Sequence, residues 1–153
     1  MDFVINNAKV ITSSGVCEHI SIGIQDGIIA KIREGWLSNG GHSVDANGSY
    51  ILPGFIDMHS DAIEKEIEPR PGAVFPTDVA IFELDKRLAS CGGTTMYHSL
   101  SFAENEVGLR SNKNASDIAM RITDLAPSLK VRTKIHVRYE VTDTTALPFI
   151  EAL

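Results

Sequence analysis

The chain has 153 residues, of which 43% are hydrophobic and 22% are charged, as in an ordinary globular domain. Its formal net charge is -6 and it has no basic run, which argues against a nucleic-acid partner, because phosphate backbones would be repelled. It also has no charged-then-apolar leader and no long apolar span. We therefore expect a cytoplasmic protein without a membrane partner, in which Cys17 and Cys91 remain thiols.

Residues 1–50 have the pattern of short strands joined by turns. Ile20, Ile22 and Ile24 alternate with small or polar residues, and Asp26-Gly27 is a strong two-residue hairpin signal. The pattern predicts a small antiparallel β unit. Because so few strands leave open edges, we expect it to gain partners from elsewhere.

From residue 51 onward, apolar strands alternate with helical patterns. This alternation predicts βαβ units that form a parallel sheet, so that the chain is an α/β protein. The first strand covers residues 51–58, and the loop at 104–114 follows the carboxyl end of the second. The other expected elements are a helix from Thr77 or Asp78 to about Ser90, a strand at 94–100, a helix capped by Ser116, a strand at 131–141 and a helix from about Thr145.

The first strand ends in a pair of residues that could bind a metal ion. Strand side chains alternate, so Asp57, His59 and Asp61 are predicted to share a face. Imidazole and carboxylate groups both suit a zinc-like divalent ion. Asp57 could support a metal-bound histidine by a hydrogen bond to its ring, without itself binding the ion. The alternative is a strand-end histidine capped by a neighbouring acid.

The third strand carries a second set of polar residues on one face, His136, Arg138 and Glu140. Burying three such groups inside a barrel would cost free energy unless ions or substrate interacted with them. Glu140 is the candidate third metal ligand, and Arg138 is a candidate substrate contact. The alternatives are a buried Arg138–Glu140 ion pair and a core role for His136.

The segment at 62–76 is rich in proline and charge. Lys65 and Arg70 could bind phosphate oxygens, with Arg70 held in an extended pose by the prolines on either side. The alternative is a solvated loop, whose cations pair with Glu64, Glu66 and Glu68.

These segments together carry a family resemblance. LPGFIDMHSD resembles the first barrel strand of the amidohydrolase superfamily, whose usual signature there is His-x-His, with Asp61 in place of the second histidine. With IEKEIEPRPG and IHVRYEV, it is most similar to a narrower branch, the α-D-ribose 1-methylphosphonate 5-triphosphate diphosphatases of the carbon-phosphorus lyase pathway.

The resemblance implies a partial (β/α)8 TIM-type barrel over residues 51–153, preceded by a small amino-terminal β-sandwich segment at 1–50. A complete barrel takes about 250 residues, so we expect this chain to be the amino-terminal portion of the enzyme. The catalytic residues are then expected on strands beyond this chain. The isolated portion is expected to be inactive, and we expect a homo-oligomer.

The resemblance also implies a metal-dependent hydrolase that cleaves a small phosphorylated sugar phosphonate, the 5-triphosphate, to the 5-phosphate and diphosphate. One or two divalent ions are implied, with zinc favoured by the donor types. The metal ligands would be His59, Asp61 and Glu140, and the substrate contacts Lys65, Arg70 and Arg138. The alternatives are another amidohydrolase acting on a cyclic amide or deamination substrate, and a non-catalytic truncated scaffold.

Overall fold

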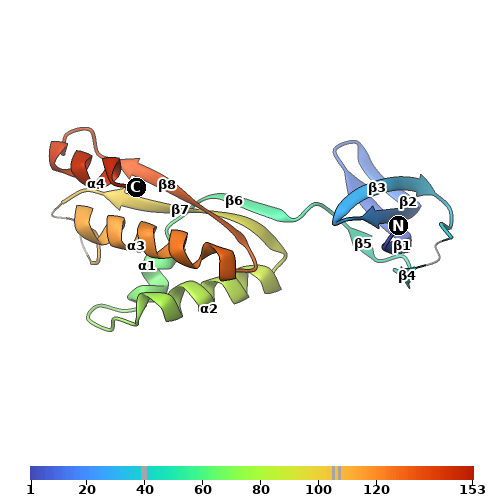
Figure 1. Cartoon of the computed structure of the whole chain (residues 1–153), viewed down its shortest axis with the longest axis horizontal. Helices are drawn as coiled ribbons and strands as arrows, with labels where there is room; N and C mark the ends of the chain where they lie inside the picture. The colour runs from blue at the N-terminus through green and yellow to red at the C-terminus, as the bar shows by residue number, and fades with distance from the viewer. Residues whose placement is uncertain (39–40, 105, 107) are drawn as a thin grey trace. The chain divides into compact units, whose positions relative to one another are not determined.

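The computed structural model describes residues 1–38, 41–104, 106 and 108–153. The chain divides into two compact units, Met1–Pro53 and Gly54–Leu153, whose elements are labelled in Figure 1. The division falls in the Pro53-Gly54 step between strands β5 and β6. Each unit is described by itself.

The first unit is a five-stranded sheet in the order β3-β2-β1-β4, with β5 also paired to β1. β1, β2 and β3 are antiparallel, and the turn at Asp26 and Gly27 has φ values of 52° and 74°, which confirms the hairpin. β4 and β5 pair with β1 in parallel, so the purely antiparallel prediction is wrong for them. The described residues of this first unit form a single sheet. A β-sandwich needs a second sheet packed on the first, so this unit is not a sandwich by itself. The strands are β1 Phe3–Thr12, β2 Gly15–Gln25, β3 Ile28–Glu34, β4 His42–Asp45 and β5 Tyr50–Ile51.

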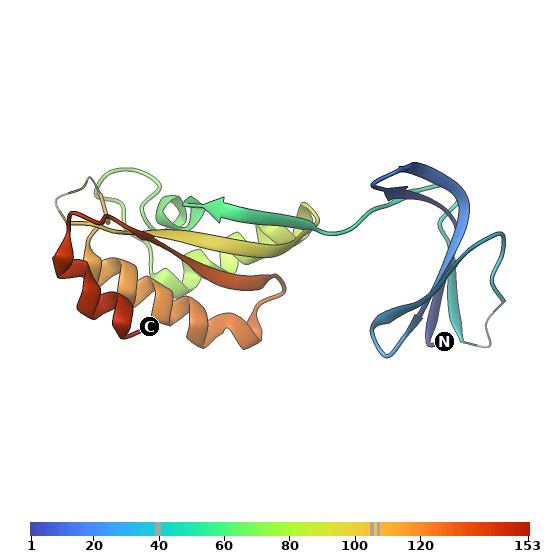
Figure 2. The same ribbon diagram turned by 90° about the horizontal axis from the view of Figure 1, so that it is seen from above.

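The second unit is a parallel sheet in the order β6-β7-β8, which confirms the predicted βαβ arrangement. The two long helices, α2 and α3, lie on one face of this sheet (Figure 2). They have 14 residues each, and none of the helices in the described part of the chain has the length and apolar character needed to span a bilayer. The elements are β6 Phe55–Ser60, α1 Ala62–Ile67, α2 Thr77–Ser90, β7 Gly93–Phe102, α3 Asn112–Leu125, η1 Ala126–Ser128, β8 Arg132–Tyr139, η2 Thr144–Ala146 and α4 Leu147–Glu151.

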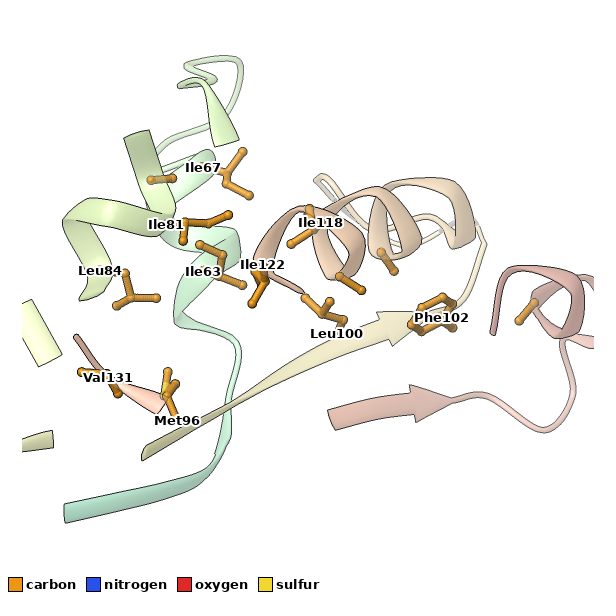
Figure 3. Close-up of a cluster of buried hydrophobic side chains, with 14 residues drawn as sticks. Ile63, Ile67, Ile81, Leu84, Met96, Leu100, Phe102, Ile118, Ile122 and Val131 are labelled. Carbon is orange, nitrogen blue, oxygen red and sulfur yellow. The ribbon is translucent and has the colours of Figure 1, made fainter. Parts of the chain in front are cut away.

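The core of the second unit lies between this sheet and its helices (Figure 3). Alternate residues of β7, Met96, Leu100 and Phe102, are almost fully buried against the helices. α2 contributes Ile81 and Leu84, as its helical spacing predicts. Ile63, Ile67, Ala119 and Ile122 complete the centre of the cluster. This packing holds β7 as the central strand, with β6 and β8 on either side.

Three local features differ from the sequence expectation. β6 begins at Phe55 and is exposed along most of its length, because it is an edge strand paired only with β7. The helix α1 occupies part of the segment predicted as a loop. α3 is capped by Ser111, whose hydroxyl accepts a hydrogen bond from the Asn114 N–H, whereas Ser116 is buried inside the helix.

A buried carboxylate fixes the start of β8. Asp85 of α2 is 6% exposed and accepts hydrogen bonds from the backbone N–H groups of Lys130 (3.0 and 3.1 Å) and Val131 (2.8 Å). Asp85→Ala leaves these donors without their acceptor. We therefore expect the free energy of unfolding to fall by about 2 kcal/mol or more in urea denaturation followed by circular dichroism.

The matched control is Asp117→Ala, which removes an exposed aspartate that pairs with Lys113 on the surface of α3. Such a pair contributes at most about 0.5 kcal/mol. Equal losses in the two variants would contradict the role assigned to Asp85.

Candidate metal and anion site

Two histidines from the outer strands meet over the sheet face opposite the core. The ring centroids of His59, on β6, and His136, on β8, are 5.0 Å apart in an edge-to-face arrangement. His136 is in register with Ser99 of β7, whose hydroxyl lies 3.4 Å from Nδ1 of His136. The same Nδ1 lies 3.2 Å from the carbonyl oxygen of Met58. Donation to this carbonyl places the proton on Nδ1 and leaves Nε2 with its lone pair.

The spacing of this pair of imidazoles is compatible with two ligands of a divalent ion, and it is equally that of an ordinary edge-to-face ring pair. Zinc–nitrogen distances of about 2.0–2.1 Å and a tetrahedral angle put the ring centroids of two histidine ligands about 5 Å apart. The observed 5.0 Å between His59 and His136 agrees with this spacing. The hydrogen bond from His136 Nδ1 to a backbone carbonyl is also the support that a metal-bound histidine usually has.

A β-bulge in β6 alters the faces predicted for its side chains. Asp57 is in register with Met96 and Ser60 with His98, so three steps along β6 correspond to two along β7. The regular alternation that would put Asp57, His59 and Asp61 on one face is therefore interrupted. Asp57 Oδ1 accepts a hydrogen bond from the backbone N–H of His59 (3.1 Å) rather than from its ring, in contrast to the predicted support of a ligand histidine.

Asp61 and Glu140 lie beyond the ends of their strands. Asp61 precedes α1, and its Oδ2 accepts a hydrogen bond from the guanidinium of Arg110 (3.2 Å). Glu140 follows β8, four residues or about 13 Å of strand beyond His136. Within the described ranges, no three His, Cys, Asp or Glu side chains converge in a way that could hold a metal ion. The chain thus places His59 beside His136, and it does not gather His59, Asp61 and Glu140 into one cluster.

The three cations expected to contact substrate have no ion-pair partner among the residues that the structure describes. Lys65 and Arg70 are exposed, and Arg138 is half-buried on β8 without an ion pair to Glu140. The predicted alternative of a buried Arg138–Glu140 pair is therefore wrong. The carboxylates expected to neutralise the loop cations are engaged elsewhere: Glu64 with Arg110, Glu66 with Arg87, and Glu68 with the N–H of Gly72.

A tight turn holds the backbone of Arg70. The Ala73 N–H donates to the Arg70 carbonyl (3.0 Å), and Gly72 has a φ of 76°. Proline at the second position and a left-handed glycine at the third are the signature of a type II turn. Arg70 therefore begins a pre-organised turn with its guanidinium exposed.

His98 is a buried histidine that the sequence analysis did not single out. It lies on β7, is 2% exposed, and neither ring nitrogen has a hydrogen-bond partner among the described residues. Burial lowers the pKa of His98 to about 4, and the charge of Asp57 opposes the shift. Its imidazole is therefore neutral at pH 7.

A cavity of about 780 Å³ lies on the helical side of the second unit. It is lined by Val74 and Val79 near α2, by Leu109, and by the Asp78–Arg121 ion pair. None of the predicted site residues lines it. The cavity therefore gives no support to the metal or phosphate hypothesis.

The fold and sequence are similar to those of amidohydrolase-superfamily hydrolases, which confirms the resemblance seen in the sequence. Relatives include the α-D-ribose 1-methylphosphonate 5-triphosphate diphosphatase of Escherichia coli strain K12, with 27% identity over 98% of this chain and 40% of the relative. The D-hydantoinase of Rhizobium radiobacter is 31% identical over 90% of this chain and 30% of the relative. No protein-family model matches the chain.

Solved structures agree at the level of the fold. The crystal structure of D-hydantoinase from Bacillus sp. AR9 matches with a TM-score of 0.67 and 20% identity, over 99% of this chain and 30% of that chain. The present chain thus spans 40% or less of the curated relatives described above. The match covers 99% of this chain, so it includes both units.

Proposed function

We propose that this chain is the amino-terminal portion of a metal-dependent hydrolase that cleaves α-D-ribose 1-methylphosphonate 5-triphosphate to the 5-phosphate and diphosphate. The observation that supports it most is the pair of histidines, His59 and His136, together with the cations of the 62–76 segment, which have no ion-pair partner among the described residues. Similarity to a diphosphatase along 98% of the chain favours this substrate. The chain has 14 Lys and Arg residues against 20 Asp and Glu residues, so its net charge repels a triphosphate. A triphosphate can therefore bind only where positive side chains are concentrated locally.

The second unit would then be the first three strands of a (β/α)8 barrel, and residues 1–50 one face of a β-sandwich. β6 and β8 are the edges of the described parallel sheet, and the remaining barrel strands would pair with them. Phe55, Ile56 and Met58 on β6 are exposed large apolar residues that such a completed fold would cover. We propose a homo-oligomer and a cytoplasmic location for the complete protein.

The chain's own residues have distinct roles in this proposal. His59, with His136 beside it, would bind one or two divalent ions, zinc being favoured. Asp61 and Glu140, which this chain does not bring to His59, would serve as ligands only together with donors from the remaining strands. A bound ion would supply an activated water and polarise the phosphoryl oxygen. Lys65, Arg70 and Arg138 bind the phosphate oxygens and orient the α-phosphorus for attack. Water then bonds to that phosphorus as the bond to diphosphate breaks, its proton passes to solvent, and the charged fork of Arg70 stabilises the departing diphosphate.

A hydantoinase-like activity on a cyclic amide is the second candidate, favoured by the 31% identity to a D-hydantoinase. A cyclic amide carries no phosphate, so it would leave the exposed loop cations without a role. Asp61 also replaces the second histidine of the usual His-x-His pair. These two features make the triphosphate the better-supported substrate.

Arg70→Ala tests the substrate proposal in the complete gene product. Loss of a charge-assisted bond to phosphate is expected to lower kcat/KM for the triphosphate about 10- to 100-fold, while metal content stays unchanged. The measurement is diphosphate release, with metal content by atomic emission. Arg33→Ala is the control, because Arg33 is an exposed arginine of β3 in the first unit.

The outcomes separate the candidate functions. Wild-type turnover by Arg70→Ala would show that this loop is merely solvated and would remove the residue-level support for the triphosphate. Hydrolysis of a hydantoin but not of the triphosphate by the wild type would establish the second candidate. Absence of both activities in a metal-loaded complete protein would favour a non-catalytic scaffold.

A further inference from the structure

The strand β8 carries a row of basic side chains on one face. The row consists of every second residue of the strand: Arg132, Lys134, His136 and Arg138. The residues between them include Ile135, Val137 and Tyr139, which pack against the helical core. Because strand side chains alternate and β8 pairs with β7 without a register shift, the basic row lies on the opposite face of the sheet.

A row of hydroxyl groups on β7 runs beside this basic row. Each basic residue is in register with a residue that has a hydroxyl group, and the pairs are Arg132 with Thr95, Lys134 with Tyr97, His136 with Ser99 and Arg138 with Ser101. The hydroxyl of Ser99 lies 3.4 Å from Nδ1 of His136, which places the two rows on the same face. Ammonium, guanidinium and hydroxyl groups all donate hydrogen bonds, so this face presents donors to an anion.

The cations on the helices of the second unit are neutralised by carboxylates, whereas those of β8 are not. Ion pairs are formed by the helical residues Lys86, Arg87, Lys113 and Arg121. In the described part of the chain, Arg132, Lys134 and Arg138 form no ion pair. Three cations of one strand therefore remain unneutralised in a chain whose net charge is -6.

Acidic residues lie away from the basic row. The strands β7 and β8 contain none. Asp57 of β6 is in register with Met96, a core residue. Glu140 follows the end of β8, and its carboxylate accepts a hydrogen bond from the hydroxyl of Thr142 (3.2 Å). An anion that lies along β8 therefore meets donors from both strands and a carboxylate from neither.

We infer that the basic row of β8 binds a phosphate chain, which Lys134 and Arg138 contact from either side of His136 while the hydroxyl of Ser101 donates to it. The inference rests on the proposed function for the identity of the ligand, and it adds Lys134 and Ser101 to the residues that contact it.

The spacing of the row favours a chain of phosphates over a single anionic group. At about 3.3 Å per residue, Lys134 and Arg138 are each about 6.6 Å from His136 along the strand. A lone orthophosphate can contact only part of such a row, whereas a triphosphate can contact several members at once. Three unneutralised cations in a line also concentrate positive potential on an otherwise acidic chain. The same net charge disfavours a nucleic acid, whose long backbone would extend over acidic surface.

Isothermal titration of the complete protein with inorganic triphosphate, with metal ions chelated, measures binding apart from metal content and hydrolysis. Lys134→Gln is expected to weaken triphosphate binding about 10- to 100-fold, because a charge-assisted hydrogen bond is lost. Lys134→Arg keeps the charge and is expected to bind within about threefold of the wild type. Ser101→Ala removes a donor without changing the charge, and it is expected to weaken binding about three- to tenfold.

Two further variants separate a site from a diffuse charge effect. Lys31→Gln removes an exposed lysine of β3 in the first unit and should leave binding unchanged. Arg132 is about 13 Å from His136 along the strand, beyond the screening length of about 8 Å at physiological salt, so Arg132→Gln should cost at most about threefold. Orthophosphate should bind at least about tenfold more weakly than triphosphate at the same ionic strength.

Wild-type affinity for triphosphate in Lys134→Gln would overturn the inference, as would an equal loss in Lys31→Gln or Arg132→Gln. Tighter binding of a single-stranded oligonucleotide than of triphosphate would also overturn it. The hydrolysis assay keeps the inference distinct from the proposed function. If the wild type hydrolyses the sugar-phosphonate triphosphate and Lys134→Gln does so equally well, only the role of the row fails. If the wild type binds triphosphate through Lys134 but hydrolyses no triphosphate when loaded with metal, the proposed function fails and the binding site stands.

Discussion

His59→Ala is expected to weaken Zn²⁺ binding by more than about 100-fold, beyond the range for residues that only support a ligand. The reason is that His59 combines the donor chemistry of a zinc ligand with a ring placed 5.0 Å from that of His136. Isothermal titration of the complete metal-free protein with Zn²⁺ measures the loss. A double-mutant cycle with His136→Ala then gives the coupling between the two imidazoles, which is expected to be large because both would bind one ion.

The control is His42→Ala, which removes an exposed histidine from β4 in the first unit. It should bind Zn²⁺ like the wild type. Strictly additive losses at His59 and His136 would place the two histidines at different ions, and wild-type binding by His59→Ala would reject the metal hypothesis.

The parts of the fold that could be predicted are those determined by residues close together in the sequence. The Asp26-Gly27 hairpin depends on two residues with left-handed backbones, and the structure has both. The helix at Thr77–Ser90 depends on apolar spacing within 14 residues, and Ile81 and Leu84 are buried as expected. The parallel pairing followed from the alternation of strands with helices.

The parts that could not be predicted depend on partners far away in the chain. The bulge in β6 exists only relative to its register with β7, so no spacing within β6 reveals it. The exposure of Ile56 and Met58 reflects an edge position, whereas an apolar run reads as a buried strand. Local periodicity therefore overestimated both the burial of this strand and the regularity of its faces.

The candidate site was predicted only in part for the same reason. The strand patterns identified His59 and His136 separately as candidate site residues. Their contact could not be predicted, because the two residues are 77 positions apart in the sequence (136 − 59). Arg110 was missed altogether, because its partner Asp61 is 49 positions away and the loop around it has no motif. Long-range pairs such as these are where the structure adds most to the functional hypothesis.

His98 is expected to make the stability of the second unit depend on pH. Its pKa is about 4 in the folded chain against an ordinary value of 6.5. Above pH 6.5 both states hold a neutral imidazole, so the full stability is present. As pH falls from 6.5 toward 4, the unfolded state binds a proton that the folded state does not, and stability is lost. The loss is expected to approach about 3 kcal/mol by pH 4, because each unit of pKa difference corresponds to about 1.4 kcal/mol.

The comparison of wild type with His98→Gln isolates this contribution from the carboxylates that titrate in the same range. Urea unfolding followed by circular dichroism at pH 7.5 and pH 4.5 gives the change in unfolding free energy for each protein. That change should be smaller in His98→Gln by about 2 to 3 kcal/mol, whatever the variant's stability at pH 7.5. His42→Gln, an exposed substitution in the first unit, serves as the reference. If His98→Gln and wild type lose the same stability on acidification, the imidazole of His98 must have found a hydrogen-bond partner that keeps its protonated form in the folded protein.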